Sequence, residues 1–441
     1  MKTRSLILGA LKPSQSPVVR NSISLLISTG GTSVLGVLFW SVATHLYSVA
    51  TVGRGSVQVS SMALIANFAQ LNLSSAFIRF LPRAGIRTRT TMIVSYLGCS
   101  ILALVSAIIF LLSPLRNGIV PFTLSVEIAF AASIIFWTIF VIQDAALIAL
   151  QSTKWVPVEN ILFGAVKLGL LPILLGTPSG EGVFYSWTIP VVAAILIVNG
   201  FLFLSVVPKR IASASKLPIP PLPKPRALMS FISAEYLSGL VGTSAAFLMP
   251  LIIIKRLGPQ AAGYFYLPWL VGTSFSSLLW SIASPTIAEA AHDRMSLHDI
   301  LRKSLKLYAI FVIPASLCVV LGAPILLTLL SQRYAAHGTT LLRLIGLSFP
   351  FSAAISMYNA SLWIKKRIWV LLGIRTLSSV GLLVLTWVLL STLGVSAAGV
   401  AELTIYGVIA LSVLPIWLKW YRSIQPNEVR LAIDRYGKED S

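Results

Sequence analysis

Charged side chains are scarce in this sequence: only 11% of its 441 residues are Asp, Glu, Lys or Arg. A soluble domain usually carries about 25%. Hydrophobic residues make up 56% of the chain and the mean hydropathy is +0.88, more than one buried core accounts for. These values exclude an ordinary soluble protein, and they predict that lipid is the solvent for most of the chain.

Cysteine and histidine are rare as well, with two and four residues. Cys99 and Cys318 lie in separate apolar runs, so they predict no disulfide framework, and no histidine has a second His or Cys at metal-ligand spacing. The sequence also lacks a P-loop, a Gly-x-Ser-x-Gly motif and a dinucleotide-binding fingerprint. We therefore expect no enzyme, no catalytic residue, no metal and no cofactor. If the chain moves a solute, the lack of an ATP-binding motif predicts that it draws on an ion gradient, the membrane potential or mass action.

Apolar runs of about twenty residues are the main feature that is present. They do not alternate apolar with polar residues, which favours helices over the strands of a membrane barrel. We predict an all-α integral membrane protein with twelve transmembrane helices, arranged as two six-helix bundles. The expected spans are 22–44, 56–78, 91–113, 125–150, 158–176, 184–207, 229–254, 264–287, 305–331, 340–363, 369–392 and 397–418.

Basic residues outnumber acidic ones by 34 to 13, and most of them fall in alternate connections between the spans. Examples are Arg79 to Arg89 after the second span and Lys365 to Arg367 after the tenth. The positive-inside rule then predicts a multi-pass protein of the cytoplasmic membrane with both termini in the cytosol. The net charge of +21 is then explained by basic side chains that bind anionic lipid headgroups, and we expect no nucleic-acid partner.

A proline-rich basic segment, 216–227, divides the spans into two sets of six. Proline cannot continue a helix, so this segment is expected to be an extended cytosolic linker. The predicted domains are residues 1–215, the linker 216–227 and residues 228–441. The pairs Val52-Gly53 and Ala262-Gly263 lie about 210 residues apart at matching places in the two halves, which indicates a duplicated unit.

Ionisable residues inside spans are costly and therefore candidate functional residues. Asp144 and Lys167 lie on the two arms of one predicted hairpin, and Glu235 and Arg375 lie at similar predicted depths in the second half. One interpretation is two structural ion pairs. The alternative for Glu235 is coupling to a proton or Na⁺, because the first helix of the second half would line a cleft between the halves.

Amides are also unusual in a span. Asn67, Gln70 and Ser74 are spaced i, i+3 and i+7 in the second span, which predicts that they share one helix face. Because amides are poor neighbours for lipid, we expect this face to line a cavity.

Three segments resemble a known family. They are Leu71-Asn72-Leu73-Ser74-Ser75-Ala76-Phe77-Ile78-Arg79-Phe80-Leu81-Pro82-Arg83, Leu257-Gly258-Pro259-Gln260-Ala261-Ala262-Gly263-Tyr264-Phe265, and the stretch from Pro324 to Arg343. Their order resembles that of the polysaccharide biosynthesis (oligosaccharide-lipid) flippases of the multidrug/oligosaccharidyl-lipid/polysaccharide exporter superfamily. The first segment departs from the family pattern at Asn72, where glycine is frequent.

The resemblance implies two six-helix bundles in a V around a central cavity, working by alternating access. It implies a polyprenyl-pyrophosphate-linked oligosaccharide as cargo, with Arg79, Asn67, Gln70 and Arg375 as candidate substrate-binding residues. Other membrane enzymes of polysaccharide assembly are candidate partners. Arg79 also has a plain interpretation as a positive-inside anchor.

Two other functions are open. An ion-coupled multidrug and toxin antiporter of the same superfamily would keep Glu235 as its coupling residue, although the first span lacks the acidic residue such antiporters commonly carry. A membrane-embedded glycosyl polymerase or ligase would need a large outer loop, and the predicted outer loops are short.

Overall fold

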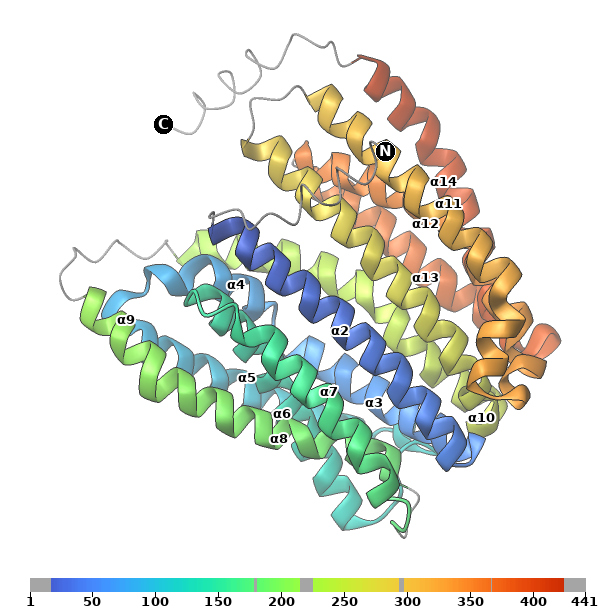
Figure 1. Cartoon of the computed structure of the whole chain (residues 1–441), viewed down its shortest axis with the longest axis horizontal. Coiled ribbons are helices and arrows are strands. Elements are labelled where there is room, and N and C mark those ends of the chain that lie inside the picture. The colour runs from blue at the N-terminus through green and yellow to red at the C-terminus, as the bar shows by residue number, and fades with distance from the viewer. Residues whose placement is uncertain (1–16, 178–180, 215–224, 293–296, 366, 424–441) are drawn as a thin grey trace, which may run out of the picture. The chain divides into compact units, whose positions relative to one another are not determined.

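The computed structural model describes the backbone of residues 17–177, 181–214, 225–292, 297–365 and 367–423. Side chains are described from residue 31 onward within these ranges, except at 213–235, 276–300 and a few single positions. The described chain is helical, with no strand in these ranges (Figure 1). The larger helices are α2 (Pro17–Leu46), α3 (Val49–Ala69), α4 (Leu73–Phe80), α5 (Thr88–Leu112), α6 (Leu124–Ala149), α7 (Trp155–Ile173), α8 (Gly182–Phe201), α9 (Val207–Ala214), α10 (Pro225–His292), α11 (Leu297–Leu330), α12 (Gln332–Ile364), α13 (Ile368–Leu393) and α14 (Ala397–Ser423).

The chain forms two compact units. The first contains residues 1–47 and 62–232, and the second contains residues 48–61 and 233–441. Helix α3 therefore contributes its first half to the second unit and its second half to the first. The expected linker 216–227 lies largely outside the described residues, and α10 already begins at Pro225.

Within the part of the chain that the structure describes, eight helical segments are long and apolar enough to cross a membrane, and the bent pair formed by α3 and α4 adds a ninth. The chain is thus a multi-pass membrane protein, as its composition predicts. Two of the eight segments, Tyr236–Phe275 with 40 residues and Ile368–Ser423 with 56, are about two to three times the length of about 20 residues that a bilayer requires. Each contains a break, the first at Gly258 and the second at the 3₁₀ turn Gly394–Ser396.

The break at Gly258 corrects one expected connection. The sequence predicts a loop between spans at 254–264, whereas the structure continues the helix on both sides of a single residue with φ 83° and ψ 176°. Glycine alone reaches this region at little cost because it has no Cβ. One glycine therefore replaces the loop that the sequence predicts.

The second expected span, 56–78, is also not one straight helix. Helices α3 and α4 meet at a 48° bend, and Leu71 and Asn72 there have φ angles of 48° and 55°. Asn is among the few side chains that tolerate this left-handed region, and Gly adopts it freely. This explains why Asn72 can stand where the resembling family often has glycine.

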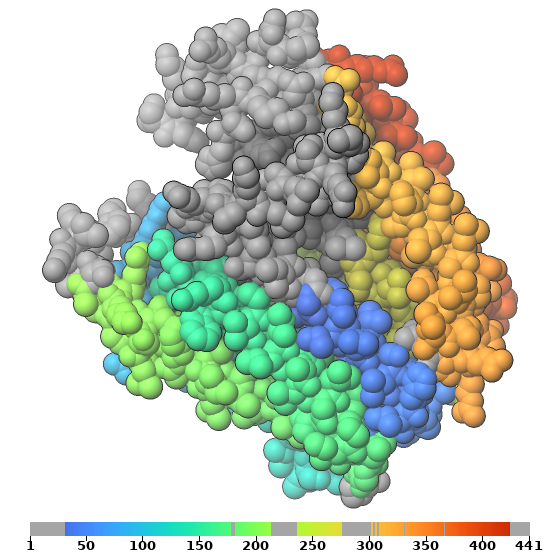
Figure 2. All heavy atoms as spheres, in the orientation of Figure 1, coloured from blue at the N-terminus to red at the C-terminus, as the bar shows by residue number. Residues whose placement is uncertain are grey.

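Large apolar side chains cover the outer surface of the first unit. Figure 2 shows one face, on which the side chains of α7 and α8 lie next to each other. On α7, Val158, Leu162 and Val166 are 44–59% exposed and follow one another at i, i+4 and i+8. Such a stripe fits contact with lipid tails.

Helices α3 and α10 cross closely within the second unit. A Cβ placed on Gly53 would lie 1.9 Å from the carbonyl oxygen of Pro259, and one on Gly263 would lie 2.3 Å from the carbonyl oxygen of Val49. Gly53 of α3 therefore lies against the backbone of α10 near Gly263, and Gly263 lies against the backbone of α3 near Gly53. Only residues without a side chain allow backbones to approach this closely.

Candidate membrane-embedded polar sites

The amide face of the second span is present and crosses the bend between α3 and α4. Gln70 donates from Nε2 to Oδ1 of Asn67 at 2.7 Å, and its own Oε1 accepts from the Ser74 hydroxyl at 3.0 Å. Beside this chain, the Ser75 hydroxyl donates to Oδ1 of Asn72 at 2.9 Å. These bonds join polar side chains from both sides of the bend. The side chains of Asn67, Gln70 and Ser74 are half-buried.

Arg79 lies at the last turn of α4, and its side chain is exposed. Its guanidinium carbon lies 5.4 Å from the centre of the Phe80 ring. The α3–α4 bend sets the direction of α4, so the backbone conformation of Leu71 and Asn72 controls where this cation points. An exposed cation in this position can bind a phosphate or act as a topology anchor.

The expected ion pair between Asp144 and Lys167 is wrong. Asp144 accepts instead from Nδ2 of Asn160 at 3.1 Å, and no ion pair joins it to Lys167. The reason is the start of α7, which begins at Trp155 rather than at the expected residue 158. Lys167 consequently lies about 18 Å into its helix, whereas Asp144 lies about 8 Å from the end of α6, at a rise of about 1.5 Å per residue.

Lys167 is held by aromatic rings. Its Nζ lies 3.5 Å from the ring centre of Trp187, 4.9 Å from that of Phe163 and 5.2 Å from that of Phe39. The residue is 4% exposed and comes from α7, while the three rings come from α8, α7 and α2. A cation surrounded by ring faces is stabilised by cation–π attraction, so rings from three helices of the first unit compensate the buried charge of this lysine.

The structure reveals a polar network that sequence reasoning missed. Gln143 donates from Nε2 to Oε1 of Glu159, and its Oε1 accepts from Nδ2 of Asn199 at 2.6 Å. Gln143 is completely buried and Glu159 is 6% exposed. The sequence did contain a signal for this network, because residues at equal distances from the turn of an antiparallel helical hairpin lie side by side. Glu159 lies at nearly the depth of Asp144 once the turn is centred near Ser152.

In the second unit, Arg375 binds the helix that carries Glu235. Its guanidinium donates to the carbonyl oxygen and to the hydroxyl of Ser238, both at 3.1 Å. Ser238 lies three residues after Glu235, on the same face of α10. The side chain of Glu235 is outside the described residues, so its expected pairing with Arg375 and its coupling role stay predictions.

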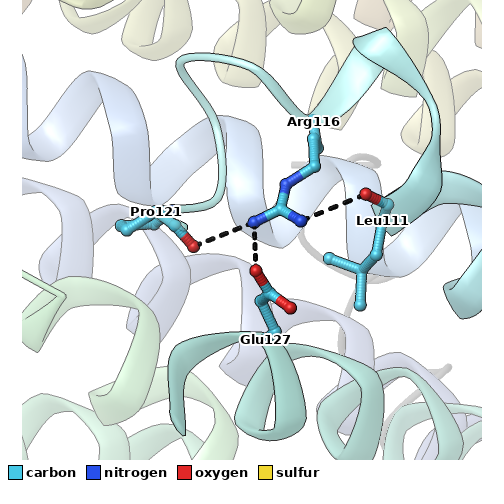
Figure 3. A network of polar contacts seen from close by, with 4 residues as sticks. All are labelled: Leu111, Arg116, Pro121 and Glu127. Carbon is cyan, nitrogen blue, oxygen red and sulfur yellow. Dashed lines mark hydrogen bonds and ion pairs between the residues drawn. The ribbon is translucent and has the colours of Figure 1, made fainter. Parts of the chain in front are cut away.

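Arg116 and Glu127 form an ion pair between the 3₁₀ turn Pro114–Arg116 and the first turn of α6 (Figure 3). The guanidinium also donates to the carbonyl oxygens of Leu111 and Pro121, at 3.2 and 3.1 Å, and stacks 4.0 Å from the Phe122 ring. Arg116 is only 7% exposed. This arginine therefore closes the α5–α6 connection and is a structural residue.

Comparison with known proteins gives two findings. Residues 192–339 match the model of a family of polysaccharide biosynthesis proteins. The matched stretch includes the 257–265 segment that carries the sequence resemblance and excludes the 71–83 segment. A search of curated protein sequences finds no match.

Solved structures share the fold over nearly the whole chain. The inward-facing conformation of a multidrug resistance MATE family transporter of the MOP superfamily aligns with a TM-score of 0.63 and 16% identity, over 94% of this chain and 100% of that one. The outward-facing conformation of such a transporter aligns with 0.57 and 14%, over 93% and 96%. A MOP superfamily transporter from Pyrococcus furiosus aligns with 0.55 and 14%, over 92% and 96%.

This chain has the fold of the MOP-superfamily transporters. Within that fold, residues 192–339 match the polysaccharide biosynthesis family. Together the two findings confirm the resemblance noted in the sequence. At 14–16% identity the solved structures establish the fold and leave the cargo open. The MOP-type fold is that of membrane transporters.

Proposed function

We propose that the chain is a flippase that moves a polyprenyl-pyrophosphate-linked oligosaccharide from the cytosolic to the outer leaflet of the cytoplasmic membrane, for synthesis of a cell-surface polysaccharide. The observation that carries the proposal is the polysaccharide biosynthesis match over residues 192–339. The transporter fold supports it, because flipping a lipid-linked sugar needs a membrane-spanning protein that can change access from one side to the other. Anionic lipids and other membrane enzymes of polysaccharide assembly are the partners we propose beside the cargo.

We infer twelve spans from the helix lengths. The nine candidate spans include Tyr236–Phe275 and Ile368–Ser423, each of which becomes two spans when divided at its break. Helix α2, with 30 residues, supplies the twelfth. The proposal keeps the arrangement implied by the resemblance, two six-helix bundles in a V around a central cavity with both termini in the cytosol.

The cargo carries a pyrophosphate, which needs cationic or amide donors. Arg79 is exposed at the end of α4, and the half-buried amides of Asn67 and Gln70 lie on the same bent span. Arginine can bind phosphate oxygens through two parallel hydrogen bonds, so Arg79 is the residue we assign to the pyrophosphate in the first unit. Arg375 is the corresponding candidate in the second unit.

A second function has its own support. The aligned solved structures include multidrug resistance MATE transporters, so an ion-coupled multidrug antiporter would use the same fold. The two proposals differ in their cargo, and one assay can separate them.

The test is translocation in proteoliposomes that contain a fluorescent polyprenyl-pyrophosphate sugar, with an added enzyme that reports headgroups in the outer leaflet. We expect wild type to flip the lipid and Arg79→Ala to flip it at least tenfold more slowly. Arg89→Ala is the matched control, because it removes an exposed arginine ten residues away near the same end of the helices. Equal rates for Arg79→Ala and Arg89→Ala would make Arg79 a topology anchor.

Glu235→Gln tests the coupling role. We expect it to flip the lipid without the dependence on a proton or Na⁺ gradient that wild type shows. If wild type moves no lipid and exchanges cationic dyes for protons instead, the antiporter replaces the flippase.

A further inference from the structure

Two carboxyl groups meet inside the first unit where α6, α7 and α8 pack together. Asp144 lies five residues before the end of α6, and Glu159 lies four residues after the start of α7. At about 1.5 Å per residue, both are roughly 6–8 Å from the turn that joins the two helices. Asp144 and Glu159 together form a carboxyl pair.

Neutral amides hold one oxygen of each carboxyl group. Asn160 donates to Oδ2 of Asp144 at 3.1 Å, and Gln143 donates to Oε1 of Glu159. Asn199 fixes Gln143 in turn through a hydrogen bond of 2.6 Å. The two carboxyl groups are thereby oriented from three helices, in the way that ligand groups of a binding site are oriented.

The other two oxygens lack a donor. Oδ1 of Asp144 and Oε2 of Glu159 are buried and have no hydrogen-bond partner within the described part of the chain. Glu159 is 94% buried, being 6% exposed. Gln143 directly precedes Asp144 and Asn160 directly follows Glu159, so the two hydrogen bonds between α6 and α7 place the carboxyl groups next to each other. An ionised carboxylate only accepts hydrogen bonds, so two neighbouring carboxylates can bond to each other only with a proton or a metal cation between them.

No basic side chain supplies that positive charge. In the described residues neither carboxyl group has an ion pair or a hydrogen bond with Lys, Arg or His. Lys167 lies two turns further along α7, where it faces aromatic rings. Tyr96 on α5 is the titratable group that faces the carboxyl pair from another helix, and Asn199 on α8 is neutral.

The apolar surroundings make an unshared second charge costly. Ile142, Ala145 and Ala146 of α6 are buried in one cluster against which Tyr96 and Val198 pack. Two neighbouring carboxylates in such surroundings would repel each other with little screening by water.

We propose that the carboxyl pair is a binding site for one proton, shared between Oδ1 of Asp144 and Oε2 of Glu159. With the proton bound, the pair carries one negative charge, distributed over two amide-bound carboxyl groups. Release of the proton toward the water beside the α6–α7 turn leaves two negative charges, and uptake restores the starting state. The site requires no particular cargo, so it stands independently of the proposed flippase function.

The experiment is infrared difference spectroscopy of the purified full-length protein during a pH titration. We expect wild type to show the carbonyl stretch of a protonated carboxyl group, which disappears when the shared proton is released and shifts in heavy water. Glu159→Gln should lose this band. Its amide brings its own hydrogen to the contact, so Asp144 no longer needs a proton. Protonated carboxyl groups elsewhere contribute equally to all variants and cancel in the comparison.

Two further variants keep the test decisive. Asp144→Asn should lose the same band for the same reason, and it serves if Glu159→Gln fails to fold. Glu127→Gln is the matched control, because it changes another glutamate of the same hairpin that is ion-paired with Arg116. The control should keep the band.

The proposal is overturned if folded Glu159→Gln and Asp144→Asn both retain the wild-type band. It is also overturned if wild type lacks the band and added Na⁺, at constant pH, perturbs carboxylate bands in wild type but not in Glu159→Gln. That second outcome would assign the carboxyl pair to Na⁺. Neither result depends on whether the protein flips a lipid.

Discussion

The close crossing of α3 and α10 in the second unit predicts a strong and unusual response to a single methyl group. In Gly53→Ala the new Cβ would lie 1.9 Å from the carbonyl oxygen of Pro259 and 2.7 Å from the backbone nitrogen of Gly263. Both neighbours are backbone atoms, which cannot rotate away as a flexible side chain can. The two helices must therefore move apart by about 1 Å before the methyl group fits.

The expected cost can be estimated from overpacked protein interiors, where extra methyl groups destabilise by about 1–3 kcal/mol and occasionally more. Because the obstruction is backbone, we expect a value near 3 kcal/mol for Gly53→Ala. Replacing glycine by alanine inside a helix returns about 1 kcal/mol in helix propensity. The net destabilisation is therefore about 2 kcal/mol.

Gly98→Ala in α5 is the matched control. It makes the same chemical change inside a membrane helix, but a Cβ at this position has no atom within 4 Å. We expect this variant to be as stable as wild type or about 1 kcal/mol more stable. At about 2 °C per kcal/mol, thermal unfolding in detergent should place Gly53→Ala about 4–6 °C below Gly98→Ala.

Gly263→Ala provides the reciprocal test, since its Cβ would lie 2.3 Å from the carbonyl oxygen of Val49. It should lose stability to a similar degree, and combining it with Gly53→Ala should cost less than the sum, because one separation of the helices relieves both contacts. Equal unfolding temperatures for Gly53→Ala and Gly98→Ala would refute the close crossing.

Three further predictions concern the first unit. Asn72→Gly should keep or slightly raise the unfolding temperature, whereas Asn72→Ala should lose about 1 kcal/mol, because alanine is strained at φ 55°; equal stability of the two variants would contradict the left-handed bend. Arg116→Ala should cost about 3 kcal/mol in chemical denaturation, because it leaves Glu127 and two carbonyl groups without their donor, and a loss under 1 kcal/mol would show that the network contributes little. Lys167→Met should change stability by less than about 1 kcal/mol, because it removes a buried charge and keeps the side-chain volume, whereas Trp187→Ala should cost about 3–5 kcal/mol; a large loss in Lys167→Met would mean that the charge itself holds the helices.

The membrane class of the fold could be predicted from the sequence because it depends on the length and hydropathy of apolar runs. The breaks within spans could not. Leu71-Asn72-Leu73 has no proline and only one polar residue, so hydropathy gives no sign that the helix bends there. Gly258 is followed by Pro259, which usually indicates a loop, yet a single residue with positive φ is enough to join the two helices.

Predicting which polar residues contact each other across two helices requires the helix boundaries to be known to within one turn. Asn67, Gln70 and Ser74, which the sequence places on one helix face, are joined by hydrogen bonds, because their spacing is short and local. The pairing of Asp144 required the depth of a residue on another helix, and an error of three residues at the start of α7 selected Lys167 instead of Glu159. Long-range pairs are sensitive to small boundary errors in a way that local faces are not.

The partners of each buried charge distinguish structural from functional groups within the first unit. Arg116 has a carboxylate, two carbonyl groups and a ring, and Lys167 has three rings, so both charges are compensated within the described structure. Asp144 and Glu159 each have one amide donor and one oxygen without a donor, and they lie next to each other in apolar surroundings. An uncompensated arrangement of this kind would destabilise the fold unless something else occupied it. The same reasoning that makes Arg116 a structural residue therefore makes the carboxyl pair a binding site, and a proton is the smallest ligand that completes it.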